Sequence, residues 1–196
     1  IQYFADHGSN VSDHGLSQIY YAEATDEEIE AIYAKAIAGD SISEAEYAKY
    51  QTRLLVELGK IYAAKDFVMQ LHFGAIRNNN KRMFAALGAD AGFDSIQDQP
   101  NVSYALNNLL GAMDLTNELP KFIAYNLDPT YFDLVGTAIT NFQANDKGIK
   151  SKVQMGSGWW FNDTKYGMLK QLKSLSEAGL LMNFVGMLTD SRSFIS

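Results

Sequence analysis

Short apolar runs alternate with amphipathic stretches along most of this chain. Four short runs are mostly apolar, at residues 67–71, 122–125, 153–155 and 184–188. Runs of this kind are typical of strands that are buried on both faces of a sheet. Helical patterns lie between them, at about 101–113, 130–144 and 163–178. The resulting order, β-α-β-α-β-α-β from residue 66, predicts an α/β fold with a parallel sheet and right-handed crossovers.

Two helices are predicted before this alternation begins, between about residues 25 and 64. Each opens on a capping-box signature, Thr25-x-x-Glu28 or Ser43-x-x-Glu46, and apolar residues then recur at helical spacing. We therefore expect a helical insertion over 25–64. Before it, residues 1–7 are expected to form a last helical turn and residues 9–13 a short strand.

The loops after the strands carry most of the polar side chains. In both major α/β architectures these loops hold the chemistry. Five stretches are expected at strand ends: residues 12–15, 70–72, 116–118, 156–160 and 189–192. Residues 76–100, with three consecutive asparagines, form a long loop-like insertion, and loops of this length are usually functional or mobile.

Composition narrows the class of protein. A net charge of −7 argues against a nucleic-acid-binding surface, and it means that a small anionic substrate needs a local cationic pocket. The chain has no cysteine, which excludes disulfides and thiolate metal sites and favours the cytoplasm. No apolar run approaches the roughly 18 residues of a membrane span. The chain starts at Ile1 without a methionine, and we expect it to be part of a longer protein.

Ionisable candidates each have a structural and a functional interpretation. Asp190, after the last predicted strand, can act as a metal ligand or general base, with Arg192 stabilising oxyanion charge, or it can simply cap a helix. His72 can ligate a metal or polarise a carbonyl, although a single histidine at a strand end is more often a structural hydrogen-bonding group. His14 has the same alternatives, and Asp13 can either orient its imidazole or cap a turn.

Aromatic and cationic candidates are similarly open. Trp159 and Trp160 follow a glycine turn, which can place one ring in the core and the other against a sugar. Arg77 can bind a carboxylate bidentately, while the polarity of its loop is equally explained by solvation. The sequence has no HxH, HExxH or GxGxxG motif, so it offers fewer than the usual three protein ligands for a metal.

Several long strings resemble one enzyme family. These are VSDHGL, QLHFGAIRNNNKRMF, DLTNELPKFIAY, VQMGSGWWFNDTKYGML and GLLMNFVGMLTDSRSF. They are similar to uronate (glucuronate) isomerase, a member of the amidohydrolase superfamily. The resemblance implies a metal-dependent (β/α)₈ TIM barrel, of which this chain would supply the C-terminal portion, strands four to eight, as about five βα units.

The resemblance also implies roles for particular residues. Asp190 matches the metal ligand and acid/base on the last strand, Arg192 the catalytic arginine, and His72 the histidine near metal and substrate. Substrate-binding roles are implied for Trp159 or Trp160, with the choice between them open, and for Arg77 and His14. The expected cofactor is a divalent metal ion, zinc or manganese, although the family's HxH metal motif on the first strand is not in this sequence.

The implied reaction converts D-glucuronate to D-fructuronate, and D-galacturonate to D-tagaturonate, through an enediolate in hexuronate catabolism. Two alternatives stay open: a metal-dependent hydrolase or decarboxylase on the same barrel, and an inactive fragment or uronate-binding module. Since a partial barrel leaves sheet edges unpaired, pairing with a second copy as a homo-oligomer is also expected. We expect the isolated chain to have no isomerase activity.

Overall fold

The computed structural model describes residues 1–144 and 148–187. The chain forms two compact units, the first comprising residues 1–12, 19–69 and 101–122, and the second comprising 13–18, 70–100 and 123 onward. Within the described ranges, no helix is long and apolar enough to span a lipid bilayer.

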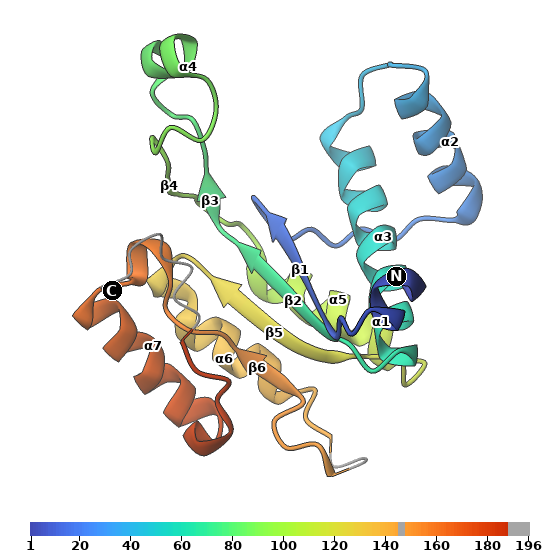
Figure 1. The fold of residues 1–196 in the computed structure, drawn as a ribbon. Helices are drawn as coiled ribbons and strands as arrows, with labels where there is room; N and C mark the ends of the chain where they lie inside the picture. The colour runs from blue at the N-terminus through green and yellow to red at the C-terminus, as the bar shows by residue number, and fades with distance from the viewer. Residues whose placement is uncertain (145–147, 188–196) are drawn as a thin grey trace. The chain divides into compact units, whose positions relative to one another are not determined.

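The fold is α/β, with a parallel sheet whose strands follow the order β1-β2-β5-β6 (Figure 1). The strands are β1 (Val11–Leu16), β2 (Val68–Phe73), β5 (Lys121–Asn126) and β6 (Val153–Met155). The apolar runs predicted β2, β5 and β6 to within two residues at either end. Strand β1 begins and ends later than the predicted 9–13.

Strand β2 shows how burial produces this pattern. Met69, Leu71 and Phe73 are at most 1% exposed, whereas Gln70 and His72 are half-buried. Successive side chains of a strand point to opposite faces of the sheet. One face of β2 is therefore apolar core, and the other presents an amide and an imidazole.

The first unit contains the predicted helices of the insertion. Its helices are α1 (Gln2–Asp6), α2 (Asp26–Ile37), α3 (Glu44–Ala64) and α5 (Val102–Asp114). Both capping boxes are confirmed. The Thr25 and Ser43 side chains each accept a hydrogen bond from the backbone N–H three residues on, and the glutamate at that position accepts one in return from the backbone N–H of Thr25 or Ser43. Helices α3 and α5 approach closely at Gly59, where a Cβ would lie only 2.1 Å from the Met113 Sδ.

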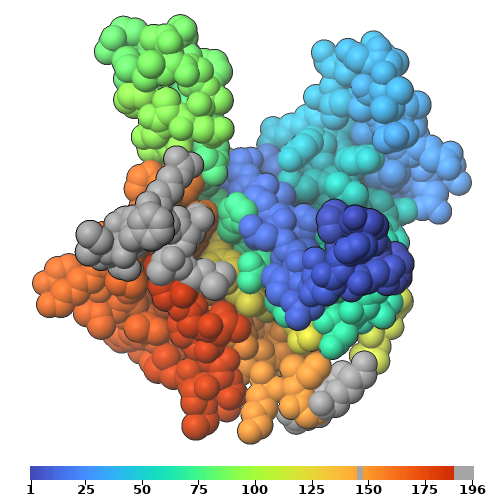
Figure 2. All heavy atoms as spheres, in the orientation of Figure 1, coloured from blue at the N-terminus to red at the C-terminus, as the bar shows by residue number. Residues whose placement is uncertain are grey.

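The second unit contains the remaining helices and an arm, residues 75–96. The helices are α4 (Lys81–Leu87), α6 (Phe132–Thr140) and α7 (Lys165–Ala178), with short 3₁₀ turns η1 (Pro129–Tyr131), η3 (Trp160–Asn162) and η4 (Leu181–Asn183). In the arm, β3 (Ala75–Ile76) pairs antiparallel with β4 (Ser95–Ile96) and α4 forms the tip. Figure 2 shows the arm in green, standing out from the rest of its unit. The prediction of a loop over 76–100 was therefore incomplete.

A fifth strand was predicted at residues 184–188, and this prediction is wrong for 184–187, which form no strand. The Val185 N–H donates to the side-chain Oε1 of Gln154 on β6, at 3.3 Å, where a strand would use a backbone carbonyl. Within the described ranges the main sheet has four strands. The described residues thus show four strands of a parallel sheet where five were predicted, and they do not show a closed barrel. The assignment of the chain to strands four to eight of a TIM barrel stays a prediction.

Candidate functional site

A cavity of about 280 Å³ opens at the carboxyl ends of β1 and β2, within the second unit. The residues that line it include His72, Arg77 and Trp159, together with Gly15, Ser17 and Gln97. The volume lies just below the roughly 300–1,000 Å³ of pockets that hold drug-sized ligands. The cavity therefore suits a small polar molecule.

His72 is held in one orientation by Asp13 on the neighbouring strand. The His72 Nδ1 lies 2.9 Å from the Asp13 Oδ1, and the imidazole is 29% exposed. A neutral imidazole that donates Nδ1–H to a carboxylate leaves Nε2 with its lone pair available as a proton acceptor or metal ligand. This pair has the geometry of an oriented acid/base group.

Gly15 makes room for that imidazole. A Cβ at Gly15 would lie 2.6 Å from the His72 Nε2 and 3.1 Å from its Cε1. Asp13 and Gly15 are two residues apart on β1, so they face the same side of the sheet. The sequence Asp-x-Gly thus supplies both the partner and the space that His72 requires.

His14 lies on the opposite face of β1 from Asp13. Burial lowers the pKa of His14, the nearby His72 lowers it further, and the Asp13 charge opposes both effects. Asp13 forms a hydrogen bond with His72, and its predicted role in orienting His14 stays a prediction. His14 is not among the side chains that line the cavity, so its predicted contact with substrate remains a prediction.

Neither tryptophan is part of the buried core, which differs from the expectation of one core ring. The Trp159 ring meets the His72 ring edge-on, with centroids 5.3 Å apart. Its Nε1 is buried and has no hydrogen-bond partner among the described residues. Trp160 contacts the Arg77 guanidinium, whose Cζ lies 4.9 Å from the ring centroid, and stacks on Phe161.

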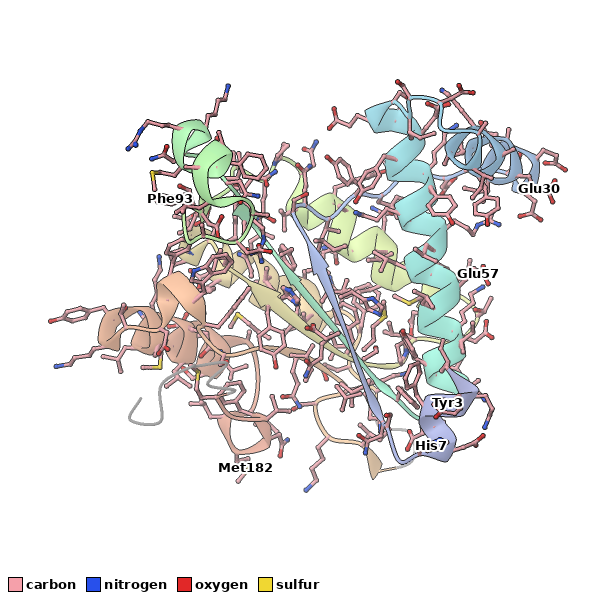
Figure 3. The ribbon with its side chains drawn as sticks, turned by 45° about the horizontal axis from the view of Figure 1, so that its top comes forward. Tyr3, His7, Glu30, Glu57, Phe93 and Met182 are labelled. Carbon is pink, nitrogen blue, oxygen red and sulfur yellow. The ribbon has the colours of Figure 1, made fainter. Side chains whose placement is uncertain are left out.

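The arm that carries Arg77 is held together by its own hydrogen bonds. Asn78 N–H donates to the Asp94 Oδ1 at 2.9 Å, and Asn79 N–H donates to the carbonyl of Phe93, a residue labelled in Figure 3. Asn80 caps α4 by accepting from a backbone N–H at 3.1 Å. The Asn78 Oδ1 also accepts from the Asp90 N–H at 3.2 Å, and the Asn79 Nδ2 donates to the Ile76 carbonyl at 2.9 Å. The three asparagine side chains therefore help to build the arm, a structural role that the sequence did not predict.

Sequence reasoning missed Tyr125, which lies beside Gln70 of the candidate stretch 70–72. The Gln70 Nε2 lies 3.5 Å from the Tyr125 hydroxyl, and a Cβ at Gly156 would lie 2.2 Å from the Tyr125 ring. Burial, with a smaller effect of the Asp13 charge, raises the pKa of Tyr125 to about 12. Tyr125 lay in a predicted strand, and nothing in the pattern distinguished it from core.

The chain matches a known family over its whole length. A family model described as glucuronate isomerase matches residues 1–196. The chain belongs to the glucuronate isomerase family. The uronate isomerase of Staphylococcus haemolyticus is 56% identical over 196 residues, and that of Salmonella newport is 55% identical over 197.

Solved structures of the family share the fold. The crystal structure of uronate isomerase from Thermotoga maritima matches with a TM-score of 0.85 at 32% identity, covering 97% of this chain and 40% of that one. Glucuronate isomerase from Caulobacter crescentus matches with a TM-score of 0.81 at 28% identity, covering 99% and 38%. The two sequence relatives are covered over 42% and 41% of their length, so the chain spans about two fifths of the family members that it matches.

Some of the candidates expected from the family resemblance cannot be placed. Asp190 and Arg192 lie outside the described residues. In the part of the chain that the structure describes, no group of three or more His, Cys, Asp or Glu side chains could hold a metal ion. These residues alone therefore do not make the metal site that the family resemblance implies.

One of the five polar stretches is at the wrong end of a strand. Residues 116–118 follow α5 and precede β5, rather than following a strand. The Thr116 hydroxyl donates to the Glu118 carboxylate at 2.6 Å, and Lys60 lies 3.8 Å from the same carboxylate. The stretch therefore stabilises a turn in the first unit.

Proposed function

We propose that the protein is a uronate isomerase that interconverts D-glucuronate with D-fructuronate and D-galacturonate with D-tagaturonate. The observation that carries this proposal is the Asp13–His72 pair at a sugar-sized cavity, in a chain 56% identical to a uronate isomerase. Isomerisation of an aldose to a ketose needs a group that moves a proton between C2 and C1 through an enediolate. An imidazole with a fixed tautomer is suited to that step.

In this proposal His72 accepts or donates the proton at Nε2, and Asp13 keeps the ring oriented. The imidazole is partly exposed to the cavity while Nδ1 is engaged, so Nε2 is the nitrogen that substrate can reach. Asp190 and Arg192 are proposed as a metal ligand with acid/base function and as the cation that stabilises the enediolate. A divalent metal, zinc or manganese, would act as a Lewis acid at the substrate oxygens when bound.

Arg77 is proposed to recognise the substrate carboxylate. Arg77 is one of the residues that line the cavity, and its side chain is 48% exposed. The Asp90 and Asp94 oxygens lie 3.6 and 3.8 Å from its Nη1, longer than a close hydrogen bond, so donor directions remain for a bidentate carboxylate. In a chain with a net charge of −7, a local cation is needed to hold an anionic sugar.

Trp159 is proposed to contact the sugar, because it lines the cavity beside His72 and its Nε1 donor lacks a partner within the described ranges. An indole offers both an apolar face for C–H groups and an N–H donor for a hydroxyl. The contact would place the sugar ring next to the imidazole that moves the proton.

The test uses the purified protein in its full natural length, with added Zn²⁺ or Mn²⁺. We expect turnover of both hexuronates and no hydrolysis of esters or amides. Arg77→Met should raise KM about 10- to 100-fold, the range for losing hydrogen bonds to a charged group, whereas Arg82→Met, an exposed arginine on the same arm, should not. Hydrolysis without isomerisation would reject the proposal.

The 196-residue chain by itself is expected to show no turnover, because the family's HxH pair is not in its sequence. Measurable isomerisation by the isolated chain would show that this pair is dispensable.

A further inference from the structure

Trp160 is held in an unusual backbone conformation. Its φ is +51°, in the left-handed region that bulky side chains rarely adopt. Such outliers persist only where the surroundings hold them in place, and they concentrate at functional sites. The conformation of Trp160 therefore calls for a reason beyond local folding.

The turn around Trp160 is held by hydrogen bonds, one of which is buried. The Asn162 Nδ2 donates to the Leu127 carbonyl at 2.6 Å, and Asn162 is 3% exposed. The Asp163 N–H donates to the Trp160 carbonyl at 3.0 Å, and a Cβ at Gly167 would lie 2.4 Å from the Asn162 carbonyl. These contacts anchor turn η3 to the segment that follows β5 and restrain the backbone around Trp160.

The conformation directs the Trp160 ring to Arg77. The guanidinium carbon lies 4.9 Å from the ring centroid, and Phe161 stacks on the same ring at 5.0 Å with an interplanar angle of 13°. The ring thus contacts a cation and two aromatic rings, Phe161 and Trp159, the latter with centroids 5.7 Å apart. Of the two tryptophans, Trp159 contacts His72 and lines the cavity. The two adjacent tryptophans have different surroundings.

We propose that Trp160 is a positioning residue for Arg77. Its ring supports the guanidinium from one side, and the carboxylates of Asp94 and Asp90 attract it at 3.8 and 3.6 Å. Asp94 is itself fixed, because its side chain is 6% exposed and accepts from the Asn78 N–H. Trp160 therefore sets where Arg77 meets the substrate carboxylate, and only Trp159 contacts the sugar. This inference rests on the function proposed above.

A double-mutant cycle between Trp160 and Arg77 tests the inference. The kinetics of D-glucuronate isomerisation are measured for Trp160→Leu, Arg77→Met and the double variant of the full-length protein. A cation–π contact contributes enough that Trp160→Leu should raise KM about 5- to 30-fold, with kcat changed by less than about twofold. In the Arg77→Met background, Trp160→Leu should raise KM no further.

Two variants guard against a general loss of folding. Trp160→Phe keeps an aromatic face, so its KM should lie much closer to the wild-type value than the raised KM of Trp160→Leu. Tyr166→Leu removes a matched but exposed cation–π contact, in which the Lys165 Nζ lies 5.8 Å from the ring, and should leave KM unchanged. Thermal melts of all variants establish that they are folded.

The outcomes separate this inference from the proposed function. Multiplicative effects of Trp160→Leu and Arg77→Met on KM, or an unchanged KM in Trp160→Leu, would overturn the positioning role while leaving the isomerase intact. If the wild-type protein neither isomerises nor binds hexuronates, the proposed function fails and this inference fails with it.

Discussion

Replacing Gly15 with alanine should damage the site without unfolding the protein. The new Cβ would lie 2.6 Å from the His72 Nε2, whereas non-bonded carbon contacts are normally about 3.5–4.0 Å. The imidazole must therefore move by about 1 Å, away from its 2.9 Å hydrogen bond with Asp13. A misplacement of about 1 Å can lower the rate about 100-fold.

The effect of Gly15→Ala on stability should be small. Losing one hydrogen bond costs about 0.5–1.5 kcal/mol, and replacing a glycine whose φ is not positive stabilises by about 0.4–1 kcal/mol through the unfolded state. These two effects nearly cancel, so the free energy of unfolding should change by less than about 1 kcal/mol.

The assay compares kcat/KM for D-glucuronate with the urea-unfolding free energy, in full-length wild type and Gly15→Ala. Gly179→Ala is the matched control, because a Cβ there would meet its nearest atom at an ordinary 3.7 Å. A folded Gly15→Ala variant with wild-type kcat/KM would show that the position of His72 does not matter to the reaction and would refute this reasoning.

Three further predictions concern stability. Lys35 and the Ser43 backbone lower the pKa of Glu46 to about 2. In urea titrations, wild type should therefore be more stable than Glu46→Gln above pH 4.5, and this difference should disappear as the pH falls toward 2. Burial raises the pKa of Tyr125 from 10 to about 12, so wild type should lose stability as the pH rises from 10 to 12. Tyr125→Phe should remove this loss, together with the change in tyrosine absorbance near pH 12. Gly59→Ala should lower the free energy of unfolding by up to about 2 kcal/mol, because overpacking costs about 1–3 kcal/mol and the higher helix propensity of alanine offsets about 1 kcal/mol of this. A rise in the free energy of unfolding would contradict the close contact between α3 and α5.

Local signals in the sequence predicted much of the fold. The capping boxes at Thr25 and Ser43 predicted where α2 and α3 begin, because the motif satisfies its own backbone donors and needs no distant partner. The apolar runs predicted β2, β5 and β6 because burial on the sheet determines their composition. Both kinds of signal act within a few residues.

The predictions that failed depend on contacts between distant segments. The run at 184–187 is as apolar as a strand, yet the Val185 N–H donates to the side chain of Gln154 on β6 and not to a backbone carbonyl of the sheet. His72 was a candidate, but its partner Asp13 lies 59 residues away, and only the pairing of β1 with β2 brings them together. Tyr125 gave no signal at all, because its environment arises from Gln70, Gly156 and Asp13 on three other segments.

The most direct test of the account is the turnover number of His72→Gln in the full-length protein, measured with D-glucuronate at saturating concentration. General acid–base catalysis contributes about 10²–10⁴-fold, so kcat should fall by at least about 100-fold while the thermal melting temperature stays near that of wild type. A folded His72→Gln variant whose kcat stays within twofold of wild type would contradict the claim that the Asp13–His72 pair moves the proton.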